Sequence, residues 1–309
     1  MGALLERALT HFPIVIELTE RALTARPTEL LHLVDQLRKR GARIALDDVG
    51  TDPRSLALLP FLRPEVIKLD LALMREVPSR QLAEVVHAVN AEAERTGALV
   101  LAEGIETERH LRRALALGAT HGQGWLFGRP GPLPAAAARA AAEGPRGSGP
   151  QLADSRQTPF EVVTAKRDTR RGDKALLLEL SRSIEAQAGG QGEAAVILSN
   201  FQEARFFSTA TARRYAALAE RAALVAALGV GLSGEPQPGV RGVDLDAAEA
   251  LGGEWDVTVL GPHFAAAFVA RDLGDRGPDF ERRFDFAITY DRELATKAAL
   301  AMMRRVAAS

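Results

Sequence analysis

Short apolar runs alternate with longer amphipathic stretches along the first 130 residues of the chain. The apolar runs predict five strands, at residues 14–18 (IVIEL), 42–48 (ARIALDD), 66–70 (VIKLD), 98–104 (ALVLAEG) and 121–128 (HGQGWLFG). The intervening stretches predict helices at residues 27–41, 55–62, 79–97 and 107–118, and residues 1–13 predict an amphipathic helix before the first strand. Strands and helices that alternate in this way form parallel βα units. A parallel sheet is covered on both faces, which explains why these strands are apolar runs.

A second α/β pattern follows a change in composition. Residues 131–159 are rich in Gly, Pro, Ala and Ser, which predicts a linker with a short alanine-rich helix before it. We therefore expect a first domain at residues 1–133, a linker at 134–157 and a second domain at 158–309. The pattern in the second domain predicts helices at residues 174–187, 211–229 and 264–274, strands at 194–201, 256–261 and 283–291, and a terminal helix.

Composition and charge narrow the class of protein. The 309 residues have a formal net charge of −1, so no overall charge recruits nucleic acid or an anionic membrane. There is no cysteine, which excludes disulfides, thiolate metal sites and cysteine nucleophiles and favours a cytoplasmic location. No apolar run approaches the roughly 20 residues that a membrane-spanning helix needs.

Polar residues gather at the carboxyl ends of the five predicted strands. They are Glu17, Glu20, Asp47, Asp48, Lys68, Asp70, Glu103, Glu106 and Gln123. Parallel strands open onto one face at their carboxyl ends, so we expect these side chains to converge. Each has a simpler explanation alone: the two aspartates precede Gly50 and could cap a turn, and the others could be solvated or paired. Several carboxylates and one lysine on one rim are nevertheless typical of a site for a hard divalent cation and a phosphate ester.

Five stretches, in order, carry a family resemblance: IELTE, ALDDVGTD, VIKLD, LAEGIET and HGQGWLFGRP. They resemble the EAL domain of cyclic di-GMP phosphodiesterases. The resemblance implies a (β/α)8 TIM-type barrel that hydrolyses cyclic di-GMP to pGpG with Mg²⁺ or Mn²⁺. It also implies that Glu17, Asp47 and Asp48 are metal ligands, that Lys68, Glu103 and Gln123 are catalytic, and that Glu20 anchors the loop after Asp48. A homodimer through this domain is a further expectation, and the substrate-binding residues stay unknown.

The chain departs from the family in two places. The strand with the Glu-Ala-Leu motif and the asparagine-bearing third strand do not precede IVIEL, so the fold class expected is a partial barrel of the last five βα units. The loop after the aspartates reads DDVGTDPRSL where the family has DDFGTGYSSL, and the changed positions include Val49, Asp52 and Pro53. We therefore expect this chain alone to be a weak phosphodiesterase or an inactive one. Strands encoded upstream of the given start are the competing explanation.

The second α/β domain resembles the DICT sensory domain. The matching stretches include DKALLLELSRSIE, RYAALAERAALVAALGVG and EWDVTVLGPHFAAAFVARDLGD. That family implies no agreed ligand and no catalytic motif, so the ligand or partner of this domain stays unknown. Trp255, His263, Phe264 and Arg271 are candidates to line a pocket. Arg213, Arg214 and Tyr215 could face solvent or meet a partner.

Three functions remain open at this point. They are a phosphodiesterase regulated by a DICT sensor, a non-catalytic cyclic di-GMP effector, and a sensor or interaction protein that works through the DICT domain.

Overall fold

The computed structural model describes residues 3–19, 26–50, 52–70, 72–73, 79–132, 157–275 and 278–306. The chain divides into two compact units, one of residues 1–20 and 33–151 and one of residues 21–32 and 152–309. The predicted loop anchor Glu20 lies outside the described residues, as does all of the predicted linker except residue 157. No helix in the described part of the chain has the length and apolar character needed to cross a membrane.

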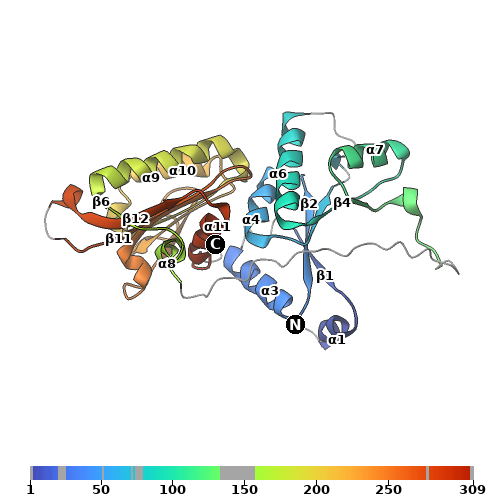
Figure 1. Cartoon of the computed structure of the whole chain (residues 1–309), viewed down its shortest axis with the longest axis horizontal. Helices are drawn as coiled ribbons and strands as arrows, with labels where there is room; N and C mark the ends of the chain where they lie inside the picture. The colour runs from blue at the N-terminus through green and yellow to red at the C-terminus, as the bar shows by residue number, and fades with distance from the viewer. Residues whose placement is uncertain are drawn as a thin grey trace. The chain divides into compact units, whose positions relative to one another are not determined.

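A parallel sheet forms the centre of the first unit (Figure 1). Its strands, in spatial as well as chain order, are β1 (Val15–Leu18), β2 (Arg43–Val49), β3 (Val66–Leu69), β4 (Leu99–Ala102) and β5 (His121–Gly122). Every neighbouring pair is parallel. The helices that precede or connect the strands are α1 (Ala3–His11), α3 (Pro27–Lys39), α4 (Leu59–Leu62), α6 (Arg80–Thr96) and α7 (Glu108–Ala116). The predicted βα alternation is confirmed, and within the described residues β1 and β5 form the edges of the sheet.

The fifth predicted strand is only partly right. Pairing with β4 covers His121 and Gly122, and a 3-10 helix then forms at Trp125–Phe127. The break lies at Gly124, whose φ is +155° and where an added Cβ would lie 2.3 Å from the backbone nitrogen of Ile105. A side chain cannot be accommodated there, so the chain uses glycine to turn out of the sheet.

Helix α6 begins and ends as the sequence predicts. The hydroxyl of Ser79 accepts a hydrogen bond from the backbone N–H of Leu82 at 3.0 Å, and Gly97 ends the helix in the left-handed conformation with φ of 75°. Val85 and Val89 lie on its buried face. These local signals fix the ends of the helix independently of its packing.

Replacing Ser79 with alanine removes this cap and is expected to lower the free energy of unfolding by about 1 kcal/mol. Urea denaturation followed by circular dichroism measures the change. Ser79→Asp is the matched control, because a carboxylate also accepts the hydrogen bond and should keep stability near that of the parent chain. Equal losses in both variants would contradict the capping role.

The second unit is built on a mixed sheet of seven strands in the order β6-β12-β11-β10-β7-β8-β9. Their bounds are β6 (Arg170–Asp173), β7 (Val196–Glu203), β8 (Leu224–Val230), β9 (Val240–Asp244), β10 (Glu254–Leu260), β11 (Ala265–Asp272) and β12 (Arg283–Thr289). The β7–β8 and β8–β9 pairs are parallel, and the remaining neighbours are antiparallel. The helices are α8 (Pro159–Thr164), α9 (Lys174–Ala188), α10 (Thr209–Ala219) and α11 (Arg292–Met303).

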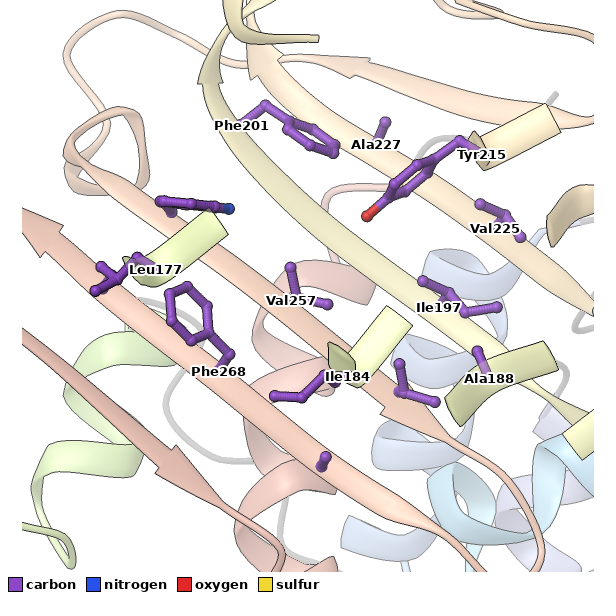
Figure 2. Packing of buried hydrophobic residues seen from close by; sticks show 14 of the residues in the cluster. Leu177, Ile184, Ala188, Ile197, Phe201, Tyr215, Val225, Ala227, Val257 and Phe268 are labelled. Carbon is purple, nitrogen blue, oxygen red and sulfur yellow. The ribbon is translucent and has the colours of Figure 1, made fainter. Parts of the chain in front are cut away.

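Helices cover both faces of this sheet (Figure 1). On the side of α9 and α10, a core forms between Leu177 and Ile184 of α9, Tyr215 of α10, and strand residues such as Val257 and Phe268 (Figure 2). Helices α8 and α11 contact each other and pack on β10 and β11 from the opposite face. The second unit is therefore a three-layer α/β/α structure, in agreement with the predicted α/β class.

One predicted helix of the second unit is only partly right, and another is wrong. The helix expected at residues 211–229 ends at Ala219, and residues 224–230 form β8 instead. The helix expected at residues 264–274 is β11, an inner strand paired on both sides. Alanine favours helices, but here its small side chains let α9 on one face and α11 on the other approach the sheet closely, so tertiary packing overrides the local preference.

Candidate functional site

The pleat of the first sheet aligns the predicted site residues on one face. Glu17 pairs with Ala45, Ala45 with Val66, two residues before Lys68, and Lys68 with Leu101. Side chains two residues apart on a strand share a face, so Asp47 follows Ala45, Glu103 follows Leu101, and Gln123 follows His121. The resulting row is Glu17, Asp47, Lys68, Glu103 and Gln123.

Asp48 reaches the same end of the sheet by a different device. The register between β2 and β3 shifts between Leu46 and Val49, so Asp47 and Asp48 together oppose Lys68 as a β-bulge. Asp48 takes a left-handed backbone with φ of 59°. Its backbone N–H donates to Oδ1 of Asp47 at 3.0 Å. Bulges of this kind redirect a side chain, and here the bulge sets two adjacent carboxylates at one strand end.

Lys68 lies at the centre of this row. Its Nζ is 2.9 Å from Oε1 of Glu17, 2.9 Å from Oδ1 of Asp47 and 2.9 Å from Oε1 of Glu103. The lysine side chain is only 7% exposed. Burial by itself lowers the pKa of a lysine, but the hydrogen bonds to the three carboxylates outweigh it and raise the pKa of Lys68 above its usual value. Lys68 is therefore a fixed positive charge at any pH near neutrality.

The electrostatics of Asp48 differ from those of the ion-paired row. Partial burial, followed by repulsion from the carboxylates of Asp47 and Asp70, raises the pKa of Asp48 above its usual value. A raised carboxylate pKa marks a place where additional positive charge would be favourable. A divalent cation is one such charge, because carboxylate oxygens are its preferred ligands.

The side chains do not form a ready metal site, however. No group of three or more His, Asp or Glu side chains among the described residues has the arrangement needed to hold a metal ion. The ammonium of Lys68 occupies the point at which Glu17, Asp47 and Glu103 meet. The donor chemistry thus fits a hard cation, while the acids are engaged by Lys68.

The loop after the aspartates has its own local structure. Val49 is fully buried, and Asp52 accepts a hydrogen bond from the backbone N–H of Arg54 at 2.9 Å. A 3-10 helix follows at Pro53–Leu58. An aspartate cap followed by proline in the first turn is a common helix start, so the residues that depart from the family pattern build a capped turn here.

A cleft of about 1160 Å³ opens beside Glu103 and Gln123 at the ends of β4 and β5. Its wall includes Trp125, which is 55% exposed, and the guanidinium of Arg129 lies 4.5 Å from the centre of the Trp125 ring. An exposed aromatic ring, a cation and carboxylates suit a nucleotide with a base and a phosphate. Reasoning from the sequence did not single out Trp125 or Arg129. The stretch WLFGR, directly after Gln123, was the available signal.

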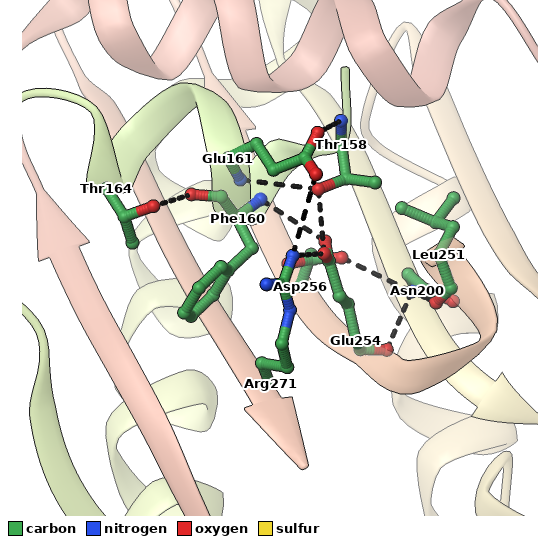
Figure 3. Close-up of polar contacts among 9 residues, drawn as sticks. All are labelled: Thr158, Phe160, Glu161, Thr164, Asn200, Leu251, Glu254, Asp256 and Arg271. Carbon is green, nitrogen blue, oxygen red and sulfur yellow. Dashed lines mark hydrogen bonds and ion pairs between the residues drawn. The ribbon is translucent and has the colours of Figure 1, made fainter. Parts of the chain in front are cut away.

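In the second unit, the predicted pocket around Trp255 and Arg271 is wrong. Trp255 belongs to the core on the α9 face, where its ring packs edge-to-face on Phe268 at 5.3 Å. Arg271 is paired in register with Glu254, the residue before Trp255, so Trp255 and Arg271 point to opposite faces. Figure 3 shows Arg271 within a polar network instead, where its guanidinium donates to Glu254 at 2.8 Å.

The arginines and tyrosine predicted near the start of α10 have different environments. Arg213 is exposed, whereas Tyr215 is fully buried. Nε of Arg214 donates to Oε2 of Glu185 at 2.6 Å, and the hydroxyl of Tyr215 donates to Oε1 of the same carboxylate at 2.9 Å. This group is part of the packing between α9 and α10.

Comparison with known proteins agrees with the two-unit organisation. Residues 2–130 match the EAL domain family, and residues 160–273 match the DICT family, described as a sensory domain in diguanylate cyclases and two-component systems. The chain is 31% identical over 121 residues to the probable cyclic di-GMP phosphodiesterase PdeA of Escherichia coli, covering 39% of this chain and 17% of PdeA. It is 34% identical over 134 residues to the cyclic di-GMP phosphodiesterase NbdA of Pseudomonas aeruginosa, covering 43% of this chain and 17% of NbdA.

A solved structure of BlrP1 from Klebsiella pneumoniae, in complex with manganese and cyclic di-GMP, is similar over 41% of this chain and 37% of BlrP1, with 29% identity and a TM-score of 0.35. The chain matches less than a fifth of the length of PdeA and less than a fifth of the length of NbdA. The chain combines an EAL domain, at residues 2–130, with a DICT sensory domain, at residues 160–273.

Proposed function

We propose that this chain is a cyclic di-GMP signalling protein whose first unit carries an EAL-type phosphodiesterase site and whose second unit is a sensor. The proposal rests on one observation above all: three carboxylates, those of Glu17, Asp47 and Glu103, meet the buried ammonium of Lys68 at the carboxyl ends of parallel strands. The names of the relatives PdeA and NbdA support cyclic di-GMP as the substrate class. The proposed domains are residues 1–133 and 158–309, joined by a linker at 134–157.

The proposed cofactor is a divalent cation, Mg²⁺ or Mn²⁺, held by Glu17, Asp47 and Asp48. Such a cation, when bound, supplies Lewis-acid polarisation of the phosphate and lowers the pKa of water. Glu17 and Asp47 form ion pairs with Lys68. Those two carboxylates must break these pairs in order to bind the cation. We therefore expect weak metal binding and slow turnover by this chain alone.

The remaining residues have distinct proposed roles. The ammonium of Lys68 offsets negative charge that develops on the phosphate, since it stays protonated near neutral pH. The carboxylate of Glu103 orients the attacking water and accepts its proton. The amide of Gln123 holds the water or the substrate, and the exposed ring of Trp125 offers a surface for a guanine base.

A second candidate is a non-catalytic effector that binds cyclic di-GMP. One specific observation favours it: the described acids form no group with the spacing of a metal site. A homodimer through the first unit is compatible with either function, and sedimentation equilibrium of the whole chain measures it.

Incubation of the purified chain with cyclic di-GMP, with Mn²⁺ or Mg²⁺ and with neither, tests the proposal. We expect slow, cation-dependent formation of pGpG, and we expect Glu103→Gln to reduce it at least about 100-fold, the scale of lost general-base catalysis. Glu84→Gln is the matched control, because Glu84 is an exposed acid of α6 paired only with nearby Arg80 among the described residues. Binding without turnover would favour the effector. Neither binding nor turnover would leave the sensory unit as the working part.

A further inference from the structure

A separate cavity of about 370 Å³ lies in the second unit, between the C-terminal halves of α9 and α10. Its apolar wall includes Ala188 of α9, Ile197 of β7 and Leu218 of α10. Ala188 and Ile197 are neighbours in the core view of Figure 2. The volume falls at the lower end of the roughly 300–1,000 Å³ range of small-molecule pockets. It would therefore hold one small molecule.

The charged groups that line this cavity are predominantly positive. Arg182, Arg214 and Arg221 contribute three guanidinium groups, and Glu185 contributes one carboxylate. Arg182 pairs with exposed Glu179 at 2.7 Å. The guanidinium of Arg221 has no hydrogen-bond or ion-pair partner within the described ranges. The lining thus has an excess of positive charge beside an apolar surface.

Glu185 does not neutralise this excess for an incoming ligand. Its side chain is 3% exposed, and its two oxygens are taken by Nε of Arg214 and by the hydroxyl of Tyr215. The same hydroxyl lies 2.5 Å from Oγ of Ser199 in β7. Both oxygens of Glu185 already accept from these donors, so the terminal NH₂ groups of Arg214 are the part of this network that can meet an anion in the cavity.

We propose that this cavity binds a small organic anion with an apolar body, the anionic group at Arg214 and Arg221 and the apolar body against Leu218 and Ala222. Three guanidinium groups disfavour a cation, and a fully apolar molecule would make no use of the guanidinium of Arg221. The bound anion shares Arg214 with Glu185, which links the cavity through Tyr215 to the inner strand β7. The site lies in the second unit and does not depend on the phosphodiesterase proposal.

Saturation-transfer NMR with the whole chain tests the site, with hexanoate and benzoate as probes. Hexanamide and benzamide are their neutral counterparts, and inorganic phosphate is an anion without an apolar body. We expect saturable binding of the two carboxylates and at least about tenfold weaker binding of the amides and of phosphate. Equal binding of amide and carboxylate, phosphate binding as tight as hexanoate binding, or no binding of either carboxylate would each overturn the proposal.

Variants of α10 and the turn after it localise the binding. Arg221→Glu reverses a charge of the cavity, and we expect it to weaken hexanoate at least about tenfold. Arg213→Glu is the matched control, because Arg213 is also exposed but lies outside the cavity lining. Ala217→Leu fills the cavity from an exposed position and should abolish binding without a charge change. Unchanged binding in Arg221→Glu and Ala217→Leu would place any observed binding elsewhere. Lys68→Met changes the first unit alone, and its effect is measured by cleavage of cyclic di-GMP. The cavity proposal is measured by hexanoate binding in the second unit, so the two proposals can fail separately.

Discussion

Replacing Lys68 with methionine is expected to destabilise the first unit at neutral pH by about 3 kcal/mol, the lower end of the range for removing one partner of a buried ion pair. The lower end applies because Glu17 is 54% exposed and Glu103 is 27% exposed. Methionine keeps the length of the side chain but leaves three carboxylates facing one another without a cation. Urea denaturation of the parent and variant chains measures the loss, and pGpG formation should fall with it.

The pH dependence of this loss has a definite sign. The folded-state pKa of Lys68 is raised, so its stabilising contribution is complete below the ordinary lysine value of 10.5 and is lost only as pH rises through the raised value. Between pH 6 and 9 Lys68 stays protonated. The difference in free energy of unfolding between the parent and Lys68→Met should therefore not change through titration of the lysine.

A divalent cation gives this prediction a readout besides activity. In Lys68→Met the acids are no longer engaged by the ammonium, so Mn²⁺ should raise the unfolding temperature of the variant more than that of the parent. Lys39→Met is the matched control, because Lys39 is 73% exposed and pairs only with Asp35 four residues away among the described residues. We expect that control to change stability by less than about 0.5 kcal/mol. An unfolding temperature of Lys68→Met that does not respond to Mn²⁺ would contradict the assignment of Glu17 and Asp47 as metal ligands.

The sequence predicted the first unit well because its elements are marked by local signals. Ser79 and Gly97 delimit α6 by capping, and each apolar run between helices became a strand. The convergence of Glu17, Asp47, Lys68 and Glu103 followed from strand direction alone. Their roles as metal ligands and catalytic groups stay predictions.

Other features of this site were beyond sequence reasoning. A β-bulge between Leu46 and Val49 depends on the pairing of two strands, and no residue type in DDV announces it. The engagement of the acids by Lys68 depends on distances between four strands. Sequence placed these groups on one rim, but only the fold shows that a lysine, and not an open space, lies among them.

The second unit was harder to predict because its small apolar residues suit a helix as well as a strand. The run LVAALGV lies in β8 between two parallel neighbours, and AAAFVARD lies in β11 between two antiparallel ones. Neither run alternates, since both faces of the sheet are covered. Short continuous apolar runs carry no period that separates the two states. The pairing of Arg271 with Glu254 was missed for the same reason, because it required β11 to be a strand.

Two acids of β10 lie on the face opposite the α9 core, and they should respond to mutation in opposite directions. Glu254 is fully buried, and its Oε1 accepts from Oγ1 of Thr158 at 2.7 Å and from Arg271 at 2.8 Å (Figure 3). Its Oε2 accepts from the backbone N–H of Phe160 at 3.2 Å, which ties α8 to the sheet. Asp256 is also fully buried, but Oδ1 has no hydrogen-bond partner among the described residues, and Oδ2 accepts from Asn200 at 3.2 Å.

Of the two buried acids Glu254 and Asp256, we expect Asp256 to be the one that is protonated in the folded protein. Burial, followed by the charge of Glu254, raises the pKa of Asp256 well above its usual value. Burial also raises the pKa of Glu254, but Arg271, Thr158 and the backbone N–H of Phe160 donate to its carboxylate and favour the charged form, so we assign the proton to Asp256. When the pKa of an acid is raised in the folded state, the native protein binds a proton that the unfolded chain has released. The free energy of unfolding therefore falls as pH rises above the pKa of the unfolded state, which is near 4. The slope is about 1.4 kcal/mol per pH unit until the folded pKa is reached.

Asp256→Asn is therefore expected to unfold at a higher temperature than the parent chain at pH 8, with a difference that shrinks toward pH 4. Asparagine has the shape of the protonated acid and removes the proton that the parent must take up. Glu254→Gln should instead cost about 3 kcal/mol, the lower end of the range for breaking a buried pair, because Arg271 loses its partner at 2.8 Å but is 43% exposed and keeps Glu161 at 3.9 Å. Thermal unfolding of both variants from pH 4 to 8 measures the two effects.

Asp275→Asn supplies the contrasting control for pH. Hydrogen bonds from Arg283 lower the pKa of Asp275 to about 2, so its contribution is present above the unfolded value near 4 and is lost as pH falls toward 2. Its effect on unfolding thus has the opposite pH sign to that of Asp256, and it should be small because its partner Arg283 is 57% exposed to solvent. If Asp256→Asn lowered the unfolding temperature throughout pH 4 to 8, Asp256 would have to be a charged, stabilising partner of Arg271, and the assignment of the proton would be reversed. A rise confined to high pH places the proton on Asp256 and leaves Glu254 as the charged group that holds α8 on the sheet.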